Sequence, residues 1–198
     1  MEIESGAIER TAGPAAAEPP SRRRERRLVR EAQQGSGTAM ARLYSAHWRS
    51  AYRAAYLVVH DAAAAEDIAQ DGFLAAVDAL DRFDRRRPFG PWLHRIVVNR
   101  ALDWARREAL RHKVGRPDSV FAPLPPPEEI GGEMMAALKE LPAEQRAVVV
   151  LRHLLEYTPG EIAEMLELPR GTVNSRLRRG LDRLRGAAEG EIETEGGR

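Results

Sequence analysis

The segment from Glu156 to Arg185 constrains the fold most, because it predicts two short helices joined by a tight turn. Thr158 suits the N-cap of the first helix, Pro159 suits its first turn, and Glu161 completes a Thr-x-x-Glu capping box. Apolar residues then recur at helical spacing on one face: Ile162, Ala163 and Leu166. This pattern is typical of a helix-turn-helix, a motif whose second helix enters the major groove of DNA.

The second helix of this motif carries a concentrated positive charge. It follows the break at 168–171 and has its own apolar repeat, formed by Val173, Leu177, Leu181 and Leu184. Six arginines between positions 170 and 185 stand against the single acid Asp182, whereas the whole chain has a net charge of only +1. Charge alone would also suit a solvated surface helix. The capping box, the short turn and the polar helix start together favour binding to DNA.

Composition limits the class of protein. With 198 residues, 43% hydrophobic and 31% charged, the chain is expected to form one or two small soluble domains. It has no apolar run long enough to cross a bilayer, and its N-terminus lacks the pattern of a secretion signal, so we expect no membrane insertion and a cytoplasmic location. The absence of cysteine excludes disulfides, iron–sulfur clusters and thiolate zinc sites within this chain.

The chain divides into helical and non-helical segments, and the pattern predicts an all-α fold. Two small helical domains, 26–110 and 133–186, are joined by a Pro-rich linker at 111–132. Residues 1–25 are expected to be a disordered N-terminal extension and 187–198 an acidic tail. The predicted helices before the helix-turn-helix are Leu28–Gln34, Thr38–Val59, Ala62–Leu80, Gly90–Glu108, Met134–Leu141 and Ala143–Leu155.

Three segments in the right order resemble one known family. Leu141–Arg152, together with the helix-turn-helix, resembles the sigma-four domain of sigma-70 family factors. Ala65–Leu74 resembles the helix by which these factors bind core polymerase, and Phe89–Arg107 resembles their promoter-melting and −10-reading helix. Because only two domains are present, the closest group is the extracytoplasmic-function (ECF) sigma factors.

The resemblance implies a function and a set of partners. It implies an alternative sigma factor with a sigma2 bundle and a sigma4 helix-turn-helix domain. Such a factor binds core RNA polymerase, recognises the −35 and −10 elements of promoter DNA, and initiates melting. We expect no catalysis and no cofactor, and an anti-sigma factor as a regulatory partner.

Site residues follow from the same motifs. On the core-binding helix, Ile68 and Phe73 are expected to face the bundle core, while Gly72 either permits a close helix approach or weakens the helix. Candidates for core-polymerase binding are Asp67, Gln70, Asp71 and Leu74. Candidates for −10 DNA are Arg86, Phe89, Trp92, Arg95, Asn99 and Asp103, with core packing the alternative for Trp92. Candidates for −35 DNA are Arg152, Thr172, Asn174, Ser175, Arg176, Arg178 and Arg179.

Other functions are less compatible with the sequence. The five histidines are scattered without metal-ligand spacing, and no nucleophile motif or phosphate-binding glycine loop is present, so an enzyme is disfavoured. One alternative is an autonomous helix-turn-helix regulator that binds an operator as a dimer. Another is an adaptor bundle, which would leave the basic helix without a role. Dependence on core polymerase for DNA binding separates the first alternative from a sigma factor.

Overall fold

The computed structural model describes residues 21–112 and 132–195, and within these ranges the chain is helical without a β-strand, as predicted. The N-terminal half contains α1 (Arg22–Gln33), α2 (Gly37–Val59), α3 (Ala62–Ala79), the 3-10 turn η1 (Leu80–Arg82) and α4 (Phe89–His112). The C-terminal half contains α5 (Gly132–Lys139), α6 (Ala143–Val149), the π-helical turn η2 (Val150–Leu154), α7 (Pro159–Leu166) and α8 (Arg170–Glu195). The predicted extension and linker lie largely outside the described residues.

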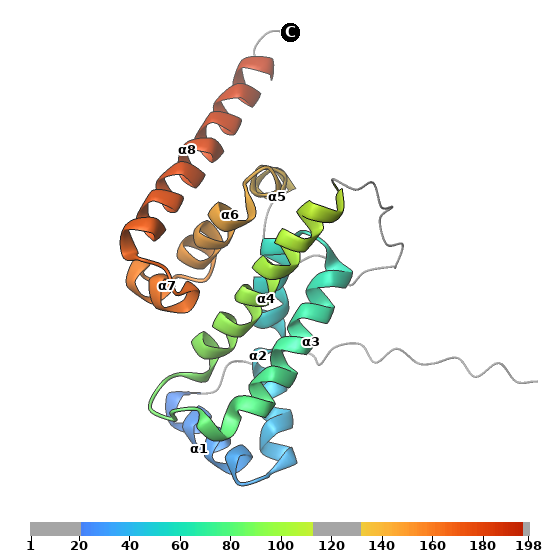
Figure 1. The fold of residues 1–198 in the computed structure, drawn as a ribbon, viewed down its shortest axis with the longest axis vertical. Helices are drawn as coiled ribbons and strands as arrows, with labels where there is room; N and C mark the ends of the chain where they lie inside the picture. Colours follow the sequence, from blue (N-terminus) through green and yellow to red (C-terminus); the bar gives the residue numbers. More distant parts are fainter. Residues whose placement is uncertain (1–20, 113–131, 196–198) are drawn as a thin grey trace, which may run out of the picture.

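Helices α2, α3 and α4 pack against one another and form the first domain (Figure 1). Two of these helices begin at side-chain caps: Ser36 Oγ accepts from the Ala39 N–H at 3.2 Å, and Asp61 Oδ1 accepts from the Ala64 N–H at 2.8 Å. Small residues allow the helix axes to approach closely, and seven alanines on these three helices are fully buried: Ala51, Ala54, Ala55, Ala65, Ala69, Ala76 and Ala101.

At Gly72, α3 and α4 approach each other closely. A Cβ at this position would lie 2.6 Å from Cγ2 of Val97, which is itself fully buried on α4. The sequence left open whether Gly72 permits a close helix approach or weakens the helix, and the structure favours the first. The glycine permits close packing of the two helices, at a cost in helix propensity of about 1 kcal/mol relative to alanine.

Helix α1 begins at Arg22, four residues before the predicted domain start at 26, because Glu25 is part of the fold. The Glu25 carboxylate is buried, with Oε1 3.0 Å from His47 Nε2 and Oε2 accepting from the Phe89 N–H at 3.2 Å. Burial raises its pKa, but these hydrogen bonds outweigh burial and hold the pKa of Glu25 below its ordinary value. Glu25 thus joins α1, α2 and the start of α4.

The two halves share one hydrophobic core, which the separate sequence motifs did not indicate. Helix α6 packs on α2 and α4, and α7 packs on α4 (Figure 1). Arg146 on α6 donates from Nη1 to the Val58 carbonyl at 2.8 Å and from Nη2 to the Leu141 carbonyl at 3.0 Å. Its guanidinium therefore binds one carbonyl in the last turn of α2 and another just after the end of α5. We call this packing of the two domains the closed arrangement.

Candidate functional site

The helix-turn-helix starts at the predicted cap. The Thr158 side chain accepts from the Glu161 N–H at 3.3 Å, and the Glu161 carboxylate accepts from the Thr158 N–H at 2.8 Å. Hydrogen bonds from the Thr158 side chain and backbone lower the pKa of Glu161, so the carboxylate is favoured at the positive end of the helix. The capping box is confirmed. Along α7, Ile162 and Met165 are the buried residues, whereas Ala163 and Leu166 are half-buried.

The turn of the motif contains a non-glycine residue in left-handed backbone. Glu167 has φ 54° and ψ 43° and follows the last residue of α7. The Leu168 N–H donates to the Ala163 carbonyl at 3.0 Å, and the Val173 N–H to the Pro169 carbonyl at 3.2 Å, so the turn closes one helix and opens the next. Glycine is the usual residue at such a position because it has no Cβ to clash.

Helix α8 buries Val173 and Leu177 against the domain and turns its polar side outward. Gly180 lets it approach α6 closely, since a Cβ there would lie 2.8 Å from Cγ2 of Val149. Of the predicted −35 residues, Asn174, Arg178 and Arg179 are exposed, and Thr172, Ser175, Arg176 and Arg152 are half-buried. The exposed amide and guanidinium groups therefore lie on one helix and are accessible to a duplex.

The predicted core-binding residues form an exposed strip along α3. Asp67, Gln70, Asp71 and Leu74 are all exposed, and the Leu74 side chain is 58% exposed, which is high for a leucine. Ile68 and Phe73 point into the core, as predicted. A strip that combines carboxylates with an exposed leucine offers both charge and apolar area to a partner helix. We refer to these four residues as the α3 strip.

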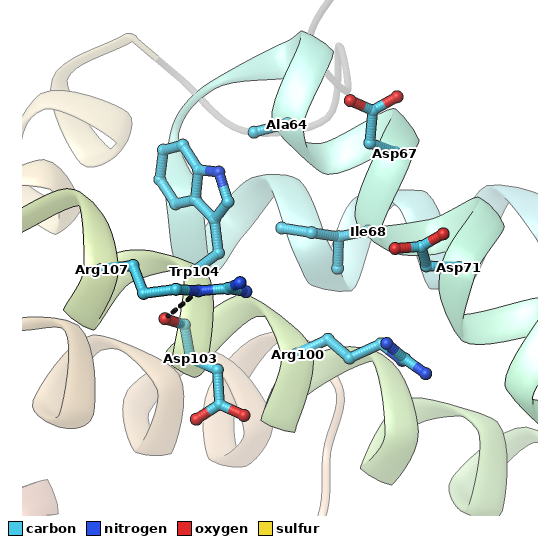
Figure 2. A pocket seen from close by; sticks show the side chains of 8 residues that line it. All are labelled: Ala64, Asp67, Ile68, Asp71, Arg100, Asp103, Trp104 and Arg107. Atoms are coloured by element: carbon cyan, nitrogen blue, oxygen red, sulfur yellow. Dashed lines mark hydrogen bonds between the residues drawn. The ribbon is translucent and has the colours of Figure 1, made fainter.

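A small groove borders this strip between α3 and α4 (Figure 2). Its volume is about 180 Å³. Asp67 and Asp71 line one side, Arg100 and Arg107 the other, and the Trp104 ring lies between the helices (Figure 2). Asp103 lies on the α4 side of this groove and pairs with Arg106 at 3.0 Å. It is therefore nearer to the α3 strip than its predicted role in −10 binding implied.

The aromatic residues predicted to face −10 DNA pack against one another. Phe89 is 0% exposed, and Trp92 is half-buried with ring centroids 4.4 Å from Phe83 and 5.6 Å from Phe89. In this arrangement Phe89 supports the fold and is not accessible to a base, whereas Trp92 packs on both phenylalanines and keeps part of its side chain exposed. Arg86 remains exposed, where it binds Asp84 at 3.1 Å and lowers the pKa of that carboxyl through hydrogen bonds.

Two other −10 candidates contact the second domain. Asn99 Nδ2 donates to the Met165 carbonyl at 3.0 Å and to the Arg95 carbonyl on its own helix at 2.9 Å. Arg95 forms an ion pair with Glu167 in the turn of the helix-turn-helix. The Met165 carbonyl belongs to the last turn of α7, so Asn99 satisfies one of the acceptors that the helix end leaves free.

A buried and a half-buried histidine lie at the same domain boundary. His94 Nδ1 is 2.7 Å from the Tyr157 hydroxyl, and burial, with a further contribution from His47, lowers the pKa of His94 to about 4. Burial raises the pKa of Tyr157, so a neutral histidine and a protonated phenol share this hydrogen bond. His60, next to Arg146, is likewise shifted to a pKa of about 4, mainly by burial.

Sequence patterns missed the residues that hold the domains together. Tyr157, Glu167 and Arg146 contact partners that lie 63, 72 and 88 positions away in the chain, and no local pattern marks such pairs. Among the described residues no group of histidine and carboxylate side chains is arranged to hold a metal, and no helix is long and apolar enough to cross a membrane.

Fold and site together define a two-domain, all-α DNA-binding protein whose first domain exposes two carboxylates and a leucine along α3. Residues 43–111 match the family model of Sigma-70 region 2, and residues 131–184 match that of Sigma-70 region 4. The chain belongs to the sigma-70 family and is an alternative sigma factor of the ECF group.

Named relatives and a solved structure agree with this assignment. SigW of Bacillus subtilis, an ECF RNA polymerase sigma factor, is 29% identical over 81% of this chain and 94% of its own length. SigM of Mycobacterium tuberculosis, also an ECF sigma factor, is 36% identical over 76% of this chain and 77% of its own length. The structure of CnrH in complex with the cytosolic domain of CnrY superposes with a TM-score of 0.63 at 27% identity, covering 84% of this chain and 98% of CnrH. Both matching family models are those of transcription initiation factors.

Proposed function

We propose specific roles for three surfaces of this sigma factor. The α3 strip (Asp67, Gln70, Asp71, Leu74) docks on core RNA polymerase. The outward side of α8 and nearby residues (Arg152, Thr172, Asn174, Ser175, Arg176, Arg178, Arg179) contact the −35 element. The exposed loop residue Arg86 and the α4 residues Trp92, Arg95, Asn99 and Asp103 contact −10 DNA, with Phe89 holding the start of α4 in place.

The α3 strip is the observation that carries the docking role. Its four side chains are exposed on one face of a helix whose other side is buried, and the exposed leucine lies beside two exposed acids. An amphipathic, acidic strip of this kind suits a partner helix with basic and apolar side chains. For DNA, the exposed arginines of α8 supply phosphate contacts and hydrogen bonds to guanine edges.

The division of the chain, its chemistry and its partners belong to the same proposal. The two DNA-binding units span 26–110 and 133–186, separated by the linker 111–132. The protein is a specificity subunit without catalysis of its own, it needs no cofactor, and it acts in the cytoplasm. CnrH was solved bound to the cytosolic domain of CnrY, and by analogy an anti-sigma factor regulates this chain.

Transcription in vitro tests the assignment of these surfaces. A promoter library is transcribed by core polymerase with and without the protein, with the double variant Asp67→Ala/Gln70→Ala, and with Arg178→Ala. We expect start sites that require the intact protein, a loss of at least tenfold for the double variant, and reduced but core-dependent initiation for Arg178→Ala. Glu133→Ala, an exposed acid on α5, is the matched control. Undiminished initiation with the double variant would refute the docking role of α3.

A further inference from the structure

Helix α1 carries a set of arginines that none of the three proposed surfaces uses. Its inward side is formed by the buried residues Glu25, Leu28 and Val29. The opposite half of the helix carries its arginines, all of them exposed: Arg22, Arg23, Arg24, Arg26, Arg27 and Arg30. The helix precedes residue 43, where the match to Sigma-70 region 2 begins, so these arginines lie outside the matched region.

The same helix is fixed against the segment that leads into α4 (Figure 1). Arg26 Nη2 donates to the Arg86 carbonyl at 3.3 Å. Gln33 Nε2 donates to the Leu80 and Phe83 carbonyls at 2.9 and 3.0 Å. Positions 26 and 33 are about two helical turns apart and lie on the same side of α1, so this side faces the segment 80–86. The arginines of α1 therefore border the loop directly.

The loop continues the positive charge towards α4. Arg85, Arg86 and Arg87 are all exposed. Arg87 also lines a cavity of about 250 Å³ together with Trp92 and Arg95, two of the residues proposed to bind −10 DNA. A basic surface therefore extends from α1 through the loop to the proposed −10 residues. We call the exposed arginines of 22–30 and 85–87 the arginine surface.

Most of the charge of this surface is not neutralised by the chain. Segments 22–33 and 84–88 contain nine arginines and three acids, a net charge of +6, whereas the whole chain has +1. One of the acids, Glu25, is buried. Glu31 pairs with Arg27 at 3.5 Å. Asp84 pairs with Arg86 at 3.1 Å, which leaves seven arginines without one of these surface acids.

The chemistry of the arginine surface suits phosphate groups. A guanidinium is a planar fork that binds two oxygens of one phosphate at once. The eight residues from Arg22 to Arg30 extend over about 12 Å, which matches about three phosphates of one DNA strand along the duplex axis. The aromatic rings of Phe83 and Phe89 are buried, so they are not available to stack on bases. The surface is therefore suited to the DNA backbone and not to reading a sequence.

We propose that the arginine surface is a further DNA-binding site, which holds the sugar–phosphate backbone of promoter DNA beside the −10 element. It fixes the position of the DNA, while the −10 residues contact the bases. The surface is exposed in the closed arrangement, so it is accessible in the free protein. Its position beside the −10 element rests on the proposed role of Trp92 and Arg95, whereas its affinity for phosphate does not.

The salt dependence of DNA binding tests the phosphate contacts. Arg23→Gln/Arg30→Gln removes two exposed charges that lie about two turns apart on one side of α1, and glutamine keeps the helix propensity of arginine. Arg111→Gln/Lys139→Gln is the matched control, because it removes the same charge from the exposed C-terminal ends of α4 and α5, away from α1 (Figure 1). Both pairs are made in an Arg178→Ala/Arg179→Ala background, which weakens binding through α8.

Fluorescence anisotropy of a labelled random-sequence duplex measures the affinity of the full-length protein from about 20 to 200 mM KCl. We expect the slope of log affinity against log salt to become shallower by about 1.5 for the α1 variant, because two phosphate contacts are lost. At about 50 mM its affinity should fall about tenfold, by the same factor for duplexes of unrelated sequence. An unchanged slope, or an equal change in the control, would overturn the proposal.

Transcription with core polymerase tests the position of the surface. Arg23→Gln/Arg30→Gln, with α8 intact, should initiate several-fold less at every promoter, and the deficit should grow with salt, while its affinity for core polymerase stays within twofold. A loss of core affinity with unchanged DNA binding would overturn the proposal, because the partner would then be the polymerase. Normal transcription with a shallower slope would overturn the position beside −10 DNA. Asn99→Ala tests the −10 residues separately, since it should lower transcription without changing the salt slope.

Discussion

Single residues decide how closely the helices of the first domain pack. Gly72 has a buried valine where its Cβ would be, and that valine is β-branched, so its χ1 angle is restricted in a helix. A change of the Val97 side chain to another rotamer is therefore energetically unfavourable. A methyl group at position 72 must therefore move α3 and α4 apart.

Gly72→Ala is expected to lower the free energy of unfolding by about 1–2 kcal/mol, because overpacking outweighs the gain in helix propensity. Urea unfolding followed by circular dichroism measures the change. Gly186→Ala on α8 is the control, since a Cβ there meets nothing within 4 Å, and it should be neutral or slightly stabilising. Adding Val97→Ala to Gly72→Ala should restore part of the loss. A stabilised Gly72→Ala protein would show that the helices are not in tight contact.

At the scale of elements, the sequence predicts features that arise between neighbouring residues, but not those that depend on contacts between residues far apart in the chain. The capping box was predictable because Thr158 and Glu161 lie three positions apart in the chain, and each bonds the other's backbone. The start of α1 at Arg22 was missed because the reason for it is the contact of Glu25 with His47 and Phe89, which lie far along the chain. The sequence also did not predict the burial of Phe89, because aromatic residues among arginines suit both a hydrophobic core and a DNA-binding surface.

The capping box makes a prediction about α7. Thr158→Ala should lower the free energy of unfolding by about 1 kcal/mol, because the Glu161 N–H loses its acceptor and the box is broken. Thr158→Ser keeps the hydroxyl and should differ from the parent by only a few tenths of a kcal/mol. Chemical denaturation of both variants provides the comparison. Equal losses for alanine and serine would mean that the threonine methyl group, not the cap, is what matters.

At the scale of the whole molecule, the continuous core joins the two domains into one packed unit. Two histidines with lowered pKa values lie at this junction, His60 facing Arg146 and Lys139, and His94 facing His47 and Tyr157. Both values are near 4, against 6.5 for an ordinary histidine. The unfolded chain therefore takes up protons first as the pH falls.

The contribution of these histidines to the free energy of unfolding should accordingly be fully present above about pH 6.5 and should decline as the pH falls toward 4. We expect His94 to contribute on the order of 2 kcal/mol, and the partly solvated His60 to contribute less. Thermal unfolding across this window measures the slope. His60→Asn/His94→Asn should flatten it, because asparagine tolerates the left-handed backbone of His60 and offers Tyr157 an oxygen acceptor. Exposed His153→Asn is the control. An unchanged slope in the double variant would assign the pH response to other groups.

The strained glutamate in the turn also bears on how sequences of this kind diverge. Replacing Glu167 with glycine would relieve the strained backbone of the turn. Selection for stability should therefore favour glycine at this position wherever the arginine at position 95 has been lost. Among related chains, an acid at position 167 should therefore accompany a base at position 95, and glycine should accompany its absence. This pair would mark, in sequence alone, which relatives fold back on themselves.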